Sequence, residues 1–185
     1  MILKLLKNPF FRFLIVGTCS YLIWVLLYEY VIEPHTTFDE WLIHRIVVRA
    51  ESLMHLFGIE TAEFQDGAYR NHIGLAGSKG VTIGAPCNGV PLFALFIIFI
   101  LAFPAKSWYQ KIWFIPTGMV LIHLVNCLRV IALAAIFDYN PEWLAFNHDY
   151  TFTILVYAFV FFLWYLFITK FSGSNNKKNA EATHS

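Results

Sequence analysis

The sequence predicts an all-α integral membrane protein, built as a bundle of about four transmembrane helices. Of its 185 residues, 58% are hydrophobic and only 14% are charged, whereas soluble domains are about 45–50% apolar and about 25% charged. Four stretches are apolar over the length that a bilayer core requires, which is about 20 helical residues. This composition excludes a soluble enzyme. The 19 Phe, 9 Tyr and 6 Trp residues exclude a disordered chain, because such chains carry few large apolar side chains.

The expected spans belong to one membrane domain, residues 1–185. They cover residues 13–32, 85–103, 112–137 and 151–169. We interpret the first as an uncleaved span, since its apolar run is longer than that of a signal peptide and no small-residue cleavage site ends it. The third is apolar except for His123, Asn126 and Arg129, whose spacing of three places them on one helical face.

The charges predict the orientation of these spans. With the N-terminus inside, the cytoplasmic parts hold eight of the 13 Lys and Arg residues, and the outer side holds eleven of the 12 acids. Short cytoplasmic segments are enriched in Lys and Arg, so we expect both termini in the cytoplasm. The polar tail, 171–185, is expected to be disordered. The net charge of +1 gives no indication of a nucleic-acid partner.

The outer segment, residues 33–84, is the one sizeable part expected outside the bilayer. Apolar residues recur at helical spacing between Phe38 and Phe57, which predicts an amphipathic helix lying along the membrane surface. Residues 69–75 and 81–83 flank Gly77-Ser78-Lys79-Gly80 and predict a short hairpin. We expect this segment to pack over the outer helix ends as a lid.

Three reactive side chains are predicted to meet at the outer face. Cys87 lies at the outer entrance of the second span, Arg129 in the outer third of the third, and His148 opens the fourth. A thiol becomes nucleophilic when a nearby cation favours the thiolate. His148 can exchange protons with the leaving and attacking groups, and the permanently charged Arg129 can stabilise an oxyanion. The trio therefore indicates acyl transfer through a thioester.

Four neighbours are expected to support this trio or to bind substrate. Gly89, with the prolines around Cys87, predicts an irregular first turn with free backbone N–H groups; Asn88 lies in the same turn. Asn126 is placed to orient Arg129 or the cysteine turn. Asp149 follows His148, but adjacent residues on an α-helix point about 100° apart, so we expect only an indirect role. His123 lies deeper and is expected to bond within the bundle.

No metal or organic cofactor is expected. Three cysteines are too few and too scattered for a zinc cluster, and the histidines of the outer segment lack the spacing of metal ligands.

The order of the motifs resembles that of the exosortase and archaeosortase family of membrane-embedded cysteine transpeptidases. Cys-Asn-Gly follows a short V-x-I strand (VTIGAPCNG, 81–89), Asn-x-x-Arg lies in a span (126–129), and a histidine opens the last span. The resemblance covers about half of the chain, from Val81 to Phe171. It implies that Cys87 is the nucleophile, Arg129 the charge stabiliser and His148 the acid and base. Many relatives have more than four spans, so the chain would be a compact member.

The resemblance also implies a substrate, partners and a location. The enzyme would sit in the cytoplasmic membrane of a bacterium or archaeon, with its active site on the extracytoplasmic face. It would cleave the C-terminal sorting signal of secreted proteins, a short motif followed by an apolar helix and a basic tail, and pass the new C-terminus to a cell-envelope acceptor. The sequence does not identify the attacking nucleophile, whether water, an amine or a lipid head group.

Two other functions remain open from the sequence. Cys87 and Cys127 could form a disulfide in a redox enzyme, although no Cys-x-x-Cys is present. Alternatively, the chain could be a non-catalytic assembly partner or a subunit that interacts with membrane lipid in an export system, in which Arg129 holds the bundle together. A structural Arg129 could pair with Glu29 or Asp149, or reach the outer lipid head groups.

Overall fold

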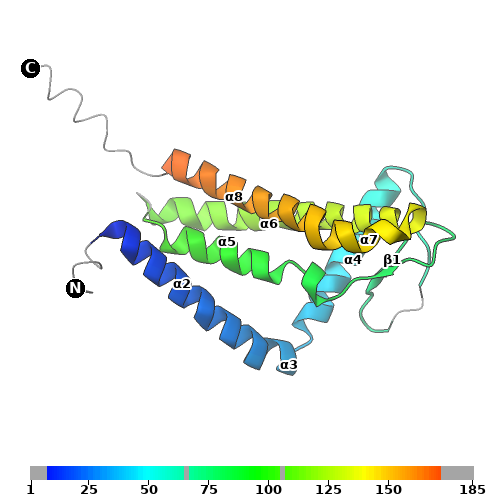
Figure 1. The fold of residues 1–185 in the computed structure, drawn as a ribbon, viewed down its shortest axis with the longest axis horizontal. Helices are drawn as coiled ribbons and strands as arrows, with labels where there is room; N and C mark the ends of the chain where they lie inside the picture. Colours follow the sequence, from blue (N-terminus) through cyan, green and yellow to red (C-terminus); the bar gives the residue numbers. More distant parts are fainter. Residues whose placement is uncertain (1–7, 65–66, 105–106, 172–185) are drawn as a thin grey trace, which may run out of the picture.

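A computed structural model describes residues 8–64, 67–104 and 107–171. The tail that we predicted to be disordered lies outside these residues from position 172 onward. Four main helices form the membrane part: α2 (Pro9–Leu27), α5 (Val90–Ala102), α6 (Trp108–Tyr139) and α8 (Phe152–Phe171). In Figure 1, α5, α6 and α8 lie side by side, and α2 is inclined away from them toward α3 (Glu33–His35). The start of α2 and the end of α8 lie at the same end of the bundle.

Among the described residues, three helical segments are long and apolar enough to cross a membrane, namely 10–35, 108–139 and 141–171. They contain the first, third and fourth expected spans. The first continues from α2 through a π-helical turn, Tyr28–Ile32, into α3. The last is preceded by short helical turns, including α7 (Leu144–Phe146) and a π-helical turn, Asn147–Thr151.

The second expected span, 85–103, is helical over a shorter range than predicted. Residues Ala85–Cys87 form a 3-10 turn, Gly89 has a φ of 79°, and α5 begins only at Val90. At 1.5 Å per residue, 13 residues extend about 20 Å, less than the roughly 30 Å of a bilayer core. Glycine in the left-handed region breaks the helix here, which leaves Cys87 in a turn at its head.

Large and small side chains interlock where α5 packs on α6 and α8. A Cβ atom on Gly118 would overlap the Phe96 ring, so the backbone of α6 comes close to α5. Three residues further along α5, Phe99 stacks on Trp164 of α8, with ring centroids 3.9 Å apart. Lys111, at the start of α6, donates to the carbonyl of Leu101 at 2.7 Å and satisfies an unpaired carbonyl of the last turn of α5.

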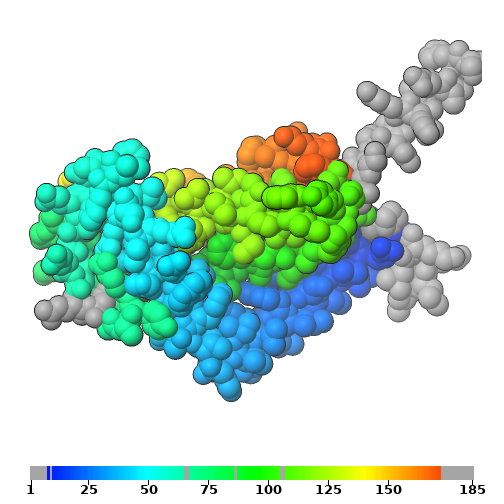
Figure 2. Space-filling view, turned by 180° about the vertical axis from the view of Figure 1, so that it is seen from behind, coloured from blue at the N-terminus to red at the C-terminus, as the bar shows by residue number. Residues whose placement is uncertain are grey.

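The expected amphipathic helix is present as α4 (Phe38–Leu56). Its buried face, which includes Leu42, Ile46, Val47, Ala50 and Met54, packs mainly against α6 and also contacts the turn that carries Cys87. Figure 2 shows α4, in cyan, lying across the outer part of the bundle. The outer segment thus covers the cysteine turn from one side.

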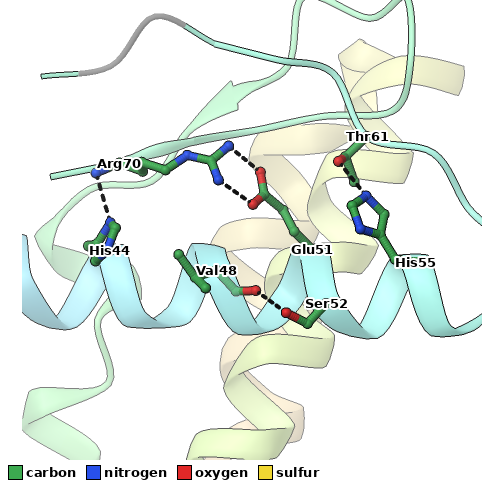
Figure 3. A network of polar contacts seen from close by, with 7 residues as sticks. All are labelled: His44, Val48, Glu51, Ser52, His55, Thr61 and Arg70. Carbon is green, nitrogen blue, oxygen red and sulfur yellow. Dashed lines mark hydrogen bonds and ion pairs between the residues drawn. The ribbon is translucent and has the colours of Figure 1, made fainter.

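The expected hairpin is also present, although it is short. Strands β1 (His72–Ile73) and β2 (Val81–Thr82) pair antiparallel, with Ile73 opposite Val81. An ion pair ties this region to α4: Nη1 and Nη2 of Arg70 each donate to one carboxylate oxygen of the buried Glu51 at 2.6 Å, and the Arg70 backbone amide donates to His44 Nδ1 (Figure 3). Paired, hydrogen-bonded charges of this kind are tolerated inside a protein. They hold the segment before β1 against α4, and β2, which pairs with β1, leads to Cys87.

Candidate active site

Hydrogen bonds to residues of three helices hold the turn that carries Cys87. The amide of Asn126, on α6, donates to the Cys87 carbonyl at 2.7 Å. Asn88 is fully buried. Its side-chain oxygen, Oδ1, accepts from the Val90 backbone amide at 2.8 Å, and its side-chain nitrogen, Nδ2, donates to Asp39 on α4 at 2.7 Å. The turn is thus bonded to α4, α5 and α6 at once, and the position of the sulfur is fixed by the fold rather than by the turn alone.

The imidazole of His148 approaches this sulfur directly. Its Nε2 atom lies 3.0 Å from Cys87 Sγ, and its Nδ1 atom lies 2.7 Å from Asp149 Oδ1. The backbone carbonyl of His148 accepts from the hydroxyl of Thr153 at 3.0 Å. A carboxylate at Nδ1 keeps a proton on that nitrogen, which leaves Nε2 free to accept the thiol proton.

Arg129 brings a positive charge to the same place from α6. It is 7% exposed. Within the described residues, Arg129 makes one long hydrogen bond, 3.5 Å from Nη2 to the His148 carbonyl, and its buried Nε has no partner there. In the part of the chain that the structure describes, no ion pair joins Arg129 to Glu29 or Asp149, so the geometry does not favour a purely structural pairing. A buried, largely unpaired guanidinium is costly unless an anion arrives.

A cavity of about 280 Å³ opens beside these groups. Gly89, Pro91 and Leu92 line it from the α5 side, and Arg129 lines it from α6. His148, Asp149, Thr153, Val156 and Tyr157 complete the wall. The cavity therefore gives an incoming substrate access to the imidazole and the guanidinium together.

Burial and the arginine act on the thiol in opposite directions. Cys87 lies in the turn before α5, where burial raises the pKa of its thiol, and the charge of Arg129 opposes that rise. Burial has the larger effect, so the pKa of the Cys87 thiol is raised above its ordinary value. A thiol of this kind reacts by passing its proton to a neighbouring base as it attacks, and His148 is in place to take it.

The arrangement can therefore perform nucleophilic acyl transfer. It has a nucleophile bonded to a base, a carboxylate that orients the base, and a cation beside the position where negative charge would develop. These are the parts of a Cys-His-Asp constellation with an added arginine. We find no group of three or more His, Cys, Asp or Glu side chains able to hold a metal within the described ranges.

The structure brings together Cys87, Arg129 and His148 as the sequence predicted, and changes the position of Asp149. In an α-helix, adjacent side chains point about 100° apart, so we expected Asp149 to point away from the imidazole of His148. Residues 147–151 instead form a π-helical turn, a form often found at functional sites, and the carboxylate bonds directly to His148.

The sequence analysis missed three residues near the site, Tyr28, Asp39 and Thr153. Tyr28 donates to Asp39 at 2.7 Å, and Asp39 accepts from Asn88. No spacing pattern links Asp39 to Asn88, which is 49 positions away. Thr153 follows His148 by five positions. This spacing brings the two residues together in a π-helical turn, which the sequence did not predict.

The two remaining polar positions of interest lie apart from the site. His123 is 3.8 Å from Cys127 Sγ across one turn of α6, which matches the expectation that it bonds within the bundle. Cys87 and Cys127 are both free thiols, so no disulfide supports the redox alternative.

A protein-family model matches most of the chain. The model described as transmembrane exosortase, Exosortase_EpsH, matches residues 4–169. No curated protein matches the chain, and no solved structure matches it.

Proposed function

The chain belongs to the transmembrane exosortase family, and on this premise we propose that it is a membrane-embedded cysteine transpeptidase. In this proposal Cys87, His148 and Arg129 cleave a C-terminal sorting signal and transfer the shortened protein to a cell-envelope acceptor. The observation that carries the proposal is the 3.0 Å contact between Cys87 Sγ and His148 Nε2, next to a buried guanidinium with an unpaired Nε.

The first half-reaction forms a thioester. The Cys87 thiol gives its proton to His148 Nε2 as the sulfur attacks the scissile carbonyl, and Arg129 stabilises the oxyanion that results. His148 then returns the proton to the departing amine, the peptide C–N bond breaks, and the sorting signal leaves with a new N-terminus. Asp149 stabilises the imidazolium that exists between these two steps.

The second half-reaction releases the product. His148 accepts a proton from the acceptor nucleophile as that group attacks the thioester, and Arg129 again faces the oxyanion. The C–S bond breaks, and the sulfur recovers its proton from His148. An amine or a lipid hydroxyl gives transfer, and water gives hydrolysis.

An apolar groove below the reactive cavity supports the proposal that the substrate is helical. This groove, about 320 Å³, lies between α2, α5 and α8. Leu92 lines the reactive cavity and Leu95 the groove, one helical turn apart on α5. Tyr157 and Trp164 stand in the same relation on α8, seven positions apart, which is two turns on one face. A transmembrane helix lying in the groove would extend upward to Cys87.

We place this site at the extracytoplasmic face of the cytoplasmic membrane, with both termini in the cytoplasm. The distribution of charges supports this orientation, and α2 begins at the end of the bundle where α8 finishes. Secreted proteins and envelope acceptors would then both have access to Cys87. The chain is a membrane protein by its family and by its apolar helices.

The nucleophile is tested with a secreted reporter that ends in the C-terminal motif, apolar helix and basic tail of a co-expressed secreted protein. Cys87→Ala and Cys87→Ser should abolish processing, and a thioester adduct should be trapped on Cys87 in the unchanged enzyme. Cys127→Ala is the matched control and should process the reporter. Processing by Cys87→Ala would refute the assignment.

The groove is tested with bulky substitutions on α2. Thr18 lines the groove, so Thr18→Trp should raise the KM for the reporter with little effect on kcat. Ile23 is 66% exposed and does not line it, so Ile23→Trp is the matched control. Equal kinetics for the two variants would place the substrate helix elsewhere without affecting the assignment of Cys87.

A further inference from the structure

A second cavity lies between α4 and α6. It has a volume of about 450 Å³ and shares no lining residue with the cavity beside Cys87. Phe38, Trp41, Leu42, Arg45 and Arg49 line it from α4, and Met119, Val120, His123 and Leu124 line it from α6, with Phe93 of α5 between them. The proposed transpeptidase mechanism makes no use of this groove.

The groove concentrates positive charge without a matching acid. Arg45 and Arg49 are both exposed and one turn apart, a spacing at which like charges on a helix repel. Over the residues that the structure describes, neither has an ion pair. The Arg45 guanidinium lies 5.8 Å from the centre of the Trp41 ring, which holds it at the groove. An anion between the two guanidinium groups would remove their repulsion.

The acidic residues of α4 are all directed elsewhere. Asp39 accepts hydrogen bonds from Tyr28 and Asn88, and Glu51 is paired with Arg70. Glu40 lines a different cavity, with Ile43 and Tyr69. The helix thus separates its charges, with both arginines on the face that borders the groove. Among the described residues, no acidic side chain of α4 pairs with either arginine.

The remaining walls of the groove are apolar and face outward. Val120 and Leu124, one turn apart on α6, are 59% and 42% exposed, and Leu128 continues the same row at 55%. In a membrane protein, apolar side chains exposed on a spanning helix contact acyl chains. The groove therefore joins a cationic end to a lipid-facing apolar wall, which is the chemistry of an anionic amphiphile.

We propose that this groove binds an anionic phospholipid, with its phosphate between Arg45 and Arg49 and an acyl chain along Val120 and Leu124. Guanidinium groups bind phosphate oxygens through paired, charge-assisted hydrogen bonds. The bound lipid would hold α4 against α6. Because α4 also carries Asp39, which is bonded to Asn88 beside the nucleophile, the lipid would act on the position of the Cys87 turn. The proposal stands independently of the enzyme's substrate.

The test is native mass spectrometry of the full chain, purified in detergent and titrated with phosphatidylglycerol. We expect one tightly retained phosphatidylglycerol, and weaker binding of diacylglycerol, which has the chains without the phosphate. Arg45→Gln combined with Arg49→Gln should weaken binding about tenfold or more, because each lost charged hydrogen bond is sufficient for about that factor. Arg45→Lys with Arg49→Lys should recover part of the affinity.

Lys79→Gln is the control, because Lys79 is exposed on the outer segment and lies outside the groove. It should bind phosphatidylglycerol as the unchanged protein does. Equal binding by the double Gln variant would overturn the proposal, as would equal retention of diacylglycerol. Binding of inorganic phosphate as tight as that of phosphatidylglycerol would show an anion site without a lipid. Cross-linking of the reporter's sorting signal to a photoreactive residue at position 124 would assign the groove to the substrate instead.

Discussion

Exchanging Asn88 and Asp39 tests whether the hydrogen bond between them positions the nucleophile. The amide of Asn88 donates to Asp39 Oδ1 at 2.7 Å, and the other end of the Asn88 side chain accepts from the Val90 amide. Asn88→Asp keeps the acceptor for Val90 but replaces the donor with a second carboxylate. Combining it with Asp39→Asn reverses the pair, so that residue 39 donates and residue 88 accepts.

The expected loss of stability in Asn88→Asp follows from the distance between the two carboxylates. Two unit charges about 4 Å apart repel by about 4 kcal/mol at an effective dielectric constant of about 20. Uptake of a proton from pH 7 limits the penalty to a similar value, because each pKa unit corresponds to about 1.4 kcal/mol. We therefore expect Asn88→Asp to lower the free energy of unfolding by about 3–4 kcal/mol. The exchanged pair should lie within about 1 kcal/mol of the original protein, since the hydrogen bonds are restored.

Thermal unfolding in detergent and reporter processing give the two readouts. For a chain of this length, the expected loss lowers the midpoint of Asn88→Asp by about 10 °C, and processing should fall with it. Lowering the pH from about 8 to about 5 should restore part of its stability, because one carboxylate then takes up a proton and donates to the other. If the exchanged pair is no more stable or active than Asn88→Asp alone, the reasoning is refuted.

Three further predictions concern the reactive groups. Gly89→Ala should lower stability by about 1–2 kcal/mol in thermal unfolding, because a Cβ strains the left-handed backbone; an unchanged midpoint would contradict this. Asp149→Asn should reduce kcat about fivefold to tenfold in reporter kinetics with little change in KM, since the carboxylate orients His148 but is largely exposed and screened; an equal loss in kcat and gain in KM would indicate a binding role. The rate of Cys87 alkylation by iodoacetamide, followed by peptide mass spectrometry, should rise with pH. The midpoint of this pH profile should move upward in Arg129→Gln, because Arg129 lowers the pKa of the thiol. A downward shift of the midpoint would refute that electrostatic role.

The transmembrane helices could be predicted because their signal is contained within each segment. A spanning helix satisfies its own backbone hydrogen bonds and needs a fixed length of apolar residues, so composition alone locates it. The amphipathic pattern of α4 is likewise local, and its bounds differ from the prediction by one residue, Leu56 in place of Phe57. The irregular first turn of the second span was predicted from Gly89 and the prolines around Cys87, and it is present as a 3-10 turn, so that the α-helix itself begins only at Val90. Tertiary bonds from Asn126 and Asp39 accompany the turn.

The reactive trio could be predicted because a membrane reduces a three-dimensional problem to one of depth. Once the spans are placed, each polar residue has a known height, and Cys87, Arg129 and His148 fall at the same height on one side. Rotation about the helix axes is not fixed by this argument, and depth alone would also have admitted Asn126 or Asp138. The contact of 3.0 Å between sulfur and imidazole depends on how α5, α6 and α8 face one another.

The hydrogen bonds around the site could not be predicted, and their absence from the sequence signal has a physical origin. Asp39 reaches Asn88 because α4 packs its apolar face on α6, a packing for which any residues of similar shape would serve. Nothing in that apolar pattern specifies which polar residue at the edge of the face meets the turn. Asp149 reaches His148 because the backbone widens into a π-turn. Such a turn accommodates one extra residue in the helix, and the amino-acid composition gives no sign of it. The sequence therefore locates the three residues of the proposed active site, whereas the groups that bond to them become visible only once the helices are packed.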